Sequence, residues 1–224
     1  MAFPLTHLVV AERVLAKHGV DDKSAAQFLL GSISPDAVHF RKEFMGTTMS
    51  NIGATKKITH LCPISDEKWG HITDNNGWID NVQVFLCANA GDPFAAGIAV
   101  HVLTDIWNNK TLWHDFVTNF PDESAKGYNS EYYDDLRNID LRVYNELYTG
   151  SVMEQLFSCA TPHGFAGLVE TDELAAMRDS LLNKQYKNVP ANPSTDYSYL
   201  TYQQMLNFID EAAEFCASMD ICYN

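Results

Sequence analysis

The sequence predicts an all-α fold in a single domain that spans residues 1–224. Three observations support this prediction. Apolar residues recur at intervals of three and four along most of the chain, alternating strand patterns are scarce, and no internal repeat divides the sequence. Apolar residues make up 46% of the chain and charged residues 20%, which is typical of a folded domain with a sizeable core.

The first part of the chain predicts two helices and a long irregular region. The first helix is expected over residues 5–17, because Gly19 favours a helix end there. The second is expected over residues 22–31. Residues 41–65 contain two glycines and a proline and are predicted to be irregular, with a length that indicates a functional loop region.

The remaining helices follow from similar signals. One is expected over residues 78–90 and another over residues 93–107, where Asp92 suits the N-cap and Pro93 the first helical position. Residues 187–200 are predicted to be a loop. Further apolar stripes predict helices over residues 129–148, 151–159, 171–185 and 202–216, giving about seven or eight helices in all.

The charge balance excludes some classes of partner. Fifteen basic against twenty-nine acidic residues give a net charge of -14, which disfavours binding of a nucleic-acid duplex. Neither a basic membrane-binding helix nor a long apolar run is present, so stable membrane insertion is not expected. An acidic protein can still bind a phosphorylated substrate where metal cations neutralise the site. No feature of the sequence indicates an oligomeric state.

Cysteine usage and the N-terminus predict a cytoplasmic protein. Five cysteines occur without a CxxC pair, and free thiols in a reducing compartment explain an odd number better than a disulfide framework. The first residues lack the basic segment, the continuous apolar run and the cleavage site of a signal peptide.

The predicted helix over residues 93–107 carries two ionisable side chains, His101 and Asp105, in an otherwise apolar segment. Residues four apart lie on the same face of a helix, so both side chains can reach one point in space. A purely structural His–Asp hydrogen bond would explain the pair equally simply. A buried carboxylate is nevertheless costly unless it is paired or bound to a metal.

Three further residues of this kind occur in apolar surroundings. They are His7 in "PLTHLVV", Asp36 in "SISPDAVH" and His60 in "KKITHLCP". Each has an ordinary explanation alone, as a helix-start, turn or loop residue. Together with His101 and Asp105 they form a set of three imidazoles and two carboxylates, which suits zinc or a similar divalent ion.

The order of these motifs resembles the zinc-dependent phospholipase C family. The motifs are "TH" near the start, G-x-x-x-P-D, a second "TH" and G-I-x-x-H-x-x-x-D, and the resemblance covers roughly residues 5–150. The family shares its fold with single-strand-specific nucleases that use three zinc ions. The resemblance therefore implies an all-α bundle of the phospholipase C and nuclease type, with a metal cluster in its core.

The resemblance also implies a ligand set and a cofactor. Asp36, His60, His101 and Asp105 would hold one ion, and Asp105 would bridge to a second ion bound by His7. The implied cofactor is two or three zinc ions, with manganese, iron or nickel as alternatives.

Three departures from the family pattern concern the remaining ligands. Secreted members use their processed N-terminal amine as a ligand, whereas six residues precede His7 here. The family places a histidine shortly after the HxxxD segment, whereas the next histidine in this sequence is His114, further along the chain. The HxxxE pair on the next long helix is absent, and Glu131 and Asp135 are the candidates there, where carboxylates would favour manganese or iron. The acidic residues around Glu131 and Asp135 are also explained as a solvent-exposed face of that helix.

The implied activity is metal-dependent hydrolysis of a phosphoester by an activated water. The substrate would be a small phosphodiester or phosphomonoester, or a phospholipid. Asp105 would act as the bridge, and Asp36 as a ligand or as a base near the attacking water. Two alternatives remain open, namely an HD-type phosphohydrolase built on His114 and Asp115, and a metal-stabilised helical module without activity.

Overall fold

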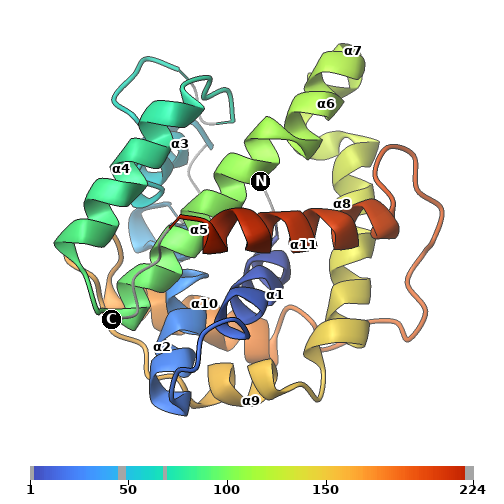
Figure 1. The fold of residues 1–224 in the computed structure, drawn as a ribbon. Helices are drawn as coiled ribbons and strands as arrows, with labels where there is room; N and C mark the ends of the chain where they lie inside the picture. The colour runs from blue at the N-terminus through green and yellow to red at the C-terminus, as the bar shows by residue number, and fades with distance from the viewer. Residues whose placement is uncertain (1–2, 45–48, 68–69, 220–224) are drawn as a thin grey trace.

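The computed structural model describes residues 3–44, 49–67 and 70–219, and it confirms the all-α prediction (Figure 1). The chain is 68% helical and forms a single compact domain. The described residues contain no strand, and pair in β fashion only at an isolated bridge between Phe165 and Val169. No helix in these ranges is both long and apolar enough to cross a bilayer.

Each helix that the sequence predicts is present, with its ends shifted by a few residues, and residues 187–200 form a loop as expected. Short 3-10 turns over Ser34–Phe40, Lys42–Phe44 and Gly127–Asn129, and a π-helical turn over Tyr144–Tyr148, complete the regular structure of the described residues. The α-helices found there are α1 (Pro4–Leu15), α2 (Asp22–Gly31), α3 (Met49–Thr59), α4 (Asn75–Ala88), α5 (Pro93–Lys110), α6 (Leu112–Asn119), α7 (Pro121–Ser124), α8 (Glu131–Val143), α9 (Val152–Cys159), α10 (Thr171–Asn183) and α11 (Tyr202–Ala217).

The structure corrects the prediction of an irregular region over residues 41–65, because α3 occupies much of it. Gly53 lies inside this helix, although glycine in a helix interior costs about 1 kcal/mol relative to alanine. Tertiary contacts compensate for this weak local preference. The helix packs against the turn Ser34–Phe40, and Lys56 and Thr59 near its end are buried.

Helix α5 lies at the centre of the fold and packs against α1, α2, α4, α6 and α11 (Figure 1). Its side chains are apolar on nearly every face, so burial on several sides is the favourable arrangement. Asp92 caps it as predicted, accepting hydrogen bonds from the backbone N–H groups of Phe94 and Ala95. His101, at the middle of the helix, and Asp105, one turn later, therefore lie deep in the protein.

Two glycines allow α2 and α5 to cross at very short range. A Cβ atom added to Gly97 would lie 2.1 Å from the carbonyl oxygen of Phe28, and one added to Gly31 would lie 2.1 Å from that of Phe94. The close approach places the carbonyl oxygen of Ser32, just after α2, 2.7 Å from Nδ1 of His101. The crossing thus helps to orient a candidate site residue.

We predict that Gly97→Ala destabilises the fold by about 1–3 kcal/mol, because the added methyl group overlaps backbone that cannot move freely. Urea denaturation would measure this loss. Gly19→Ala is the matched control, because its new Cβ would have no neighbour within 4 Å. Equal stability of the two variants would contradict the close crossing of α2 and α5.

Candidate metal centre

The structure brings five of the predicted ligands together from four segments of the chain. His7 comes from α1, Asp36 from the turn Ser34–Phe40, His60 from the residue after α3, and His101 and Asp105 from α5. The three imidazoles are fully buried and both carboxylates are buried as well. Two overlapping groups of ligand atoms result, each with all of its atoms within 4.8 Å of one another.

Four of these side chains surround a common point, here called the first centre. Nε2 of His60 lies 3.2 Å from Nε2 of His101, 3.5 Å from Oδ1 of Asp36 and 3.7 Å from Oδ2 of Asp105. Nε2 of His101 lies 3.9 Å from Oδ2 of Asp105. A tetrahedral ion about 2.1 Å from each ligand would hold two ligands about 3.4 Å apart, so each of these four separations suits a pair of ligands on one ion.

Backbone carbonyls orient the two imidazoles of the first centre. Nδ1 of His101 faces the carbonyl oxygen of Ser32 at 2.7 Å, and Nδ1 of His60 faces that of Lys56 at 2.9 Å. A carbonyl oxygen only accepts, so each Nδ1 donates and each neutral ring carries its lone pair on Nε2. Burial lowers the pKa of His60 to about 4, which favours the neutral ring. The two facing lone pairs repel one another, and a cation between them would relieve this repulsion.

His7 is the third imidazole of the cluster. It is fully buried, and neither of its ring nitrogens has a hydrogen-bond partner among the described residues. Its ring stacks on that of His101 with the centroids 3.7 Å apart, and its Nε2 lies 3.6 Å from Oδ1 of Asp105. Burial holds the pKa of His7 well below its ordinary value. Because buried polar atoms without partners are rare, a second ion between His7 and Asp105 fits this arrangement. We call this position the second centre.

Lys56 is the site residue that the sequence prediction missed. Lys56 lies on α3, one turn before His60, and its side chain is only 3% exposed. Its Nζ lies 2.7 Å from Oδ1 of Asp36. Burial alone would raise the pKa of Asp36, but the ammonium of Lys56 and the ring of His60 hold that pKa well below its ordinary value. The i, i+4 spacing in "KKITH" could have indicated it, since it repeats the spacing of His101 and Asp105.

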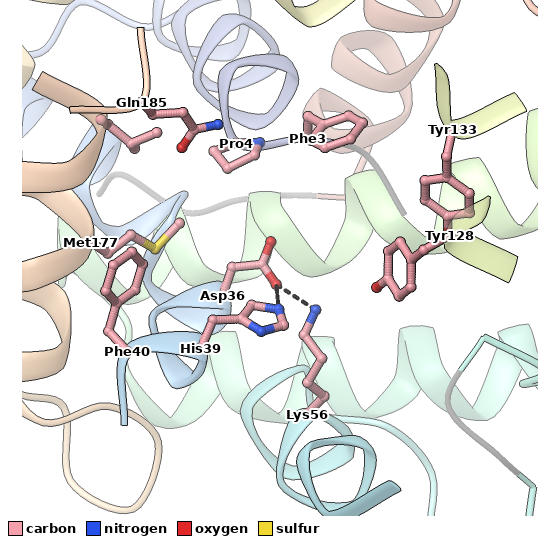
Figure 2. Close-up of a pocket in the computed structure, with 11 residues that line it drawn as sticks. Phe3, Pro4, Asp36, His39, Phe40, Lys56, Tyr128, Tyr133, Met177 and Gln185 are labelled. Carbon is pink, nitrogen blue, oxygen red and sulfur yellow. Dashed lines mark ion pairs between the residues drawn. The ribbon is translucent and has the colours of Figure 1, made fainter. Parts of the chain in front are cut away.

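A cavity of about 460 Å³ adjoins this cluster (Figure 2). Asp36 and Lys56 lie on one side of it with His39, whose Nε2 is 3.9 Å from Oδ1 of Asp36. Figure 2 shows Tyr128 and Tyr133 across the cavity from Phe40 and Met177. The remaining lining residues are Phe3, Pro4, Leu181 and Gln185, so the walls are mainly apolar and aromatic.

A smaller cavity of about 40 Å³ adjoins the other side of the cluster, next to Asp105. Tyr133 lines both cavities. A volume of this size holds a water molecule, which requires roughly 10–15 Å³ measured in this way. A cavity large enough for an organic group therefore lies next to Asp36, and a cavity large enough for water lies next to Asp105.

The structure does not bring the other three predicted ligands to the cluster. His114 on α6 and Glu131 at the start of α8 are exposed. Asp135 is buried, but its carboxylate accepts hydrogen bonds from the backbone N–H groups of Ser198, Tyr199 and Leu200, which anchor the loop before α11. None of the three belongs to a group of neighbouring ligand atoms in the described part of the chain. The structure therefore clusters five of the eight predicted ligands.

Known proteins give no assignment for this chain. No family model matches it, and neither the curated proteins nor the solved structures include a match. The functional argument therefore depends on the geometry of the five clustered residues and on the cavities beside them.

We predict that His101→Ala abolishes metal binding, because His101 contributes to both groups of ligand atoms. His114→Ala and Asp135→Ala should keep the metal content of the wild-type protein, measured by elemental analysis of freshly purified samples. Asp135→Ala should also lower the free energy of unfolding by about 1–3 kcal/mol, because backbone N–H groups lose their acceptor. Loss of metal from either control variant would restore those residues to the ligand set.

Proposed function

We propose that the protein is a metal-dependent hydrolase that cleaves a phosphoester, either a phosphodiester or a phosphomonoester, with zinc as its cofactor. The observation that supports this most strongly is the position of the cluster. Three imidazoles and two carboxylates, with nitrogens that lack partners, lie beside a cavity of about 460 Å³. Buried ligand clusters next to a cavity of this size are typical of catalytic metal sites.

The two centres differ in how many protein ligands they have. The first centre has four, namely Asp36, His60, His101 and Asp105, and such a closed set is typical of a structural ion. The second group of ligand atoms comprises His7, His101 and Asp105. Because Nε2 of His101 is already assigned to the first centre, His7 and one oxygen of Asp105 remain for the second centre among the described residues. Fewer protein ligands leave positions for water, so we assign the activation of water to the second centre and the binding of the phosphoryl group to the charged side of the large cavity beside Asp36.

The side chains of the cluster have separate tasks in this proposal. When bound, a divalent ion would acidify water and offset the negative charge of a phosphoryl group. Asp105 directs Oδ1 toward His7 and Oδ2 toward His60 and His101, which suits a bridging ligand. Asp36 has a pKa held well below its ordinary value, which makes it a weak base and supports the ligand role over the base role.

The lining of the cavity favours a substrate with an apolar organic group. Phe3, Phe40, Met177 and Leu181 contribute apolar walls, while Asp36 and Lys56 provide charge at one side. A phosphoester would place its anionic group near the charged side and its organic group between the walls. A phospholipid with its headgroup in the cavity belongs to this class.

The two alternatives receive unequal support. An HD-type enzyme would need His114 and Asp115 at the metal, yet both are exposed on α6 and His114 is in neither group of ligand atoms. A metal-stabilised module without activity is favoured by one observation, the closed ligand set of the first centre. It leaves the large cavity and the second centre unexplained.

We predict that the zinc-loaded or manganese-loaded protein hydrolyses bis(4-nitrophenyl) phosphate or 4-nitrophenyl phosphate. His7→Ala should keep one ion per chain and lose turnover by at least about 100-fold, because it removes a ligand of the second centre alone. Release of 4-nitrophenol and metal content would be measured on the same samples. His163→Ala, an exposed histidine outside the cluster, is the control and should keep both ions and full activity.

Two results would contradict the proposal. A wild-type protein that holds its ions but hydrolyses neither compound, nor a short-chain phosphatidylcholine, would favour the metal-stabilised module. Full activity of His7→Ala would move the chemistry away from the second centre.

A further inference from the structure

We propose that Lys56 binds the substrate, with its ammonium group contacting an anionic oxygen of the phosphoryl group at the charged side of the large cavity. The inference rests on the proposed function and adds a residue that the resemblance does not supply. Lys56 would provide, from the protein itself, a positive charge close to the metal ligands.

The charge distribution supports this role. The chain carries a net charge of -14, and the cluster itself contains the carboxylates of Asp36 and Asp105. An acidic protein attracts phosphate only where local cations reverse the field. Among the described residues that line the large cavity, Lys56 is the only lysine or arginine.

The position of Lys56 couples the cavity to the first centre. Its Nζ lies 2.7 Å from Oδ1 of Asp36, the same oxygen that lies 3.5 Å from Nε2 of His60. Figure 2 shows the Lys56 side chain extending from α3 toward Asp36, with Tyr128 on the far side of the cavity. An anion that contacts Nζ from the cavity therefore lies next to the ligands of the first centre.

The positive charge of Lys56 gains importance because only five of the eight predicted metal ligands lie together in the described part of the chain. His114, Glu131 and Asp135 do not assemble a third centre, and Asp135 is committed to backbone N–H groups. Apart from ions at the two centres, the Lys56 ammonium would be the positive charge that the described lining of the large cavity offers to a phosphoryl oxygen. A lysine serves here because a compact point charge attracts an anion without requiring a fixed geometry.

A purely structural role for Lys56 would be to neutralise Asp36. Such a role predicts lower stability when Lys56 is replaced, but no change in the phosphate affinity of the protein that still folds and holds its ions. Phosphate affinity at constant metal content therefore separates the two roles.

The test is a calorimetric titration of inorganic phosphate into zinc-loaded protein freed of excess metal. Lys56→Met should weaken phosphate binding at least about tenfold, because one charged contact is lost. Lys56→Arg should keep most of the affinity because it keeps the charge. Lys57→Met is the matched control, because the Lys57 ammonium donates to the backbone carbonyls of Ser65 and Glu67 and does not line the cavity.

Metal content, measured on the same samples, completes the comparison, and Lys56→Gln replaces Lys56→Met if the latter does not fold. Unchanged affinity at unchanged metal content, or no phosphate binding by the wild-type protein, would overturn the inference. If the wild-type protein hydrolyses a phosphoester but Lys56→Met binds phosphate as tightly as the wild type, the inference about Lys56 is wrong and the proposed function stands. If phosphate binding depends on Lys56 but the wild-type protein hydrolyses no phosphoester, the inference is supported and the proposed function is wrong.

Discussion

The proposed function depends on a buried set of ligand atoms at the centre of the fold, whose arrangement suits a metal ion. Asp36 and Asp105 bring carboxylates into the interior, while His60 and His101 direct Nε2 atoms at each other across 3.2 Å. Without a positive charge between them, these groups would repel one another in surroundings of low polarity. The surrounding helices fix them there nonetheless. The contact of α2 with Gly97 on α5 and the carbonyl oxygens of Ser32 and Lys56 set the directions in which the rings point.

The two sides of the cluster suit different tasks. The side of Asp36 meets a large cavity with apolar walls, whose described lining contains one lysine, whereas the side of Asp105 meets space for water. Asp105 lies between the first centre, which has more protein ligands, and the second centre, which has fewer, and it directs one carboxylate oxygen toward each. In this account the first centre holds the segments together, the second activates water, and Lys56 positions the anion. The acidic surface of the molecule then does not prevent phosphate binding, because the positive charges are concentrated at the site.

The amino-acid sequence is sufficient to predict most of the helices and the five candidate ligands that cluster, but it does not predict α3, α6 and α7 or which other residues join the cluster. The pair His101 and Asp105 stood out because an apolar helix carried two ionisable groups at helical spacing. Helix α3 was missed because Gly53 weakens its local signal, and Lys56 was missed because lysine is not a metal ligand. Asp135 is a candidate ligand in the sequence because spacing alone does not identify the partner of a carboxylate. Its carboxylate in fact binds backbone N–H groups more than sixty residues away in the chain.

The central claim is that an ion occupies the first centre. Anomalous diffraction from zinc-loaded crystals, recorded on either side of the zinc absorption edge, tests it most directly. The account predicts an anomalous peak bounded by Nε2 of His60, Nε2 of His101, Oδ1 of Asp36 and Oδ2 of Asp105, with each atom about 2.0–2.2 Å from the ion. A peak at other residues, or none at this position in zinc-saturated crystals, would contradict it.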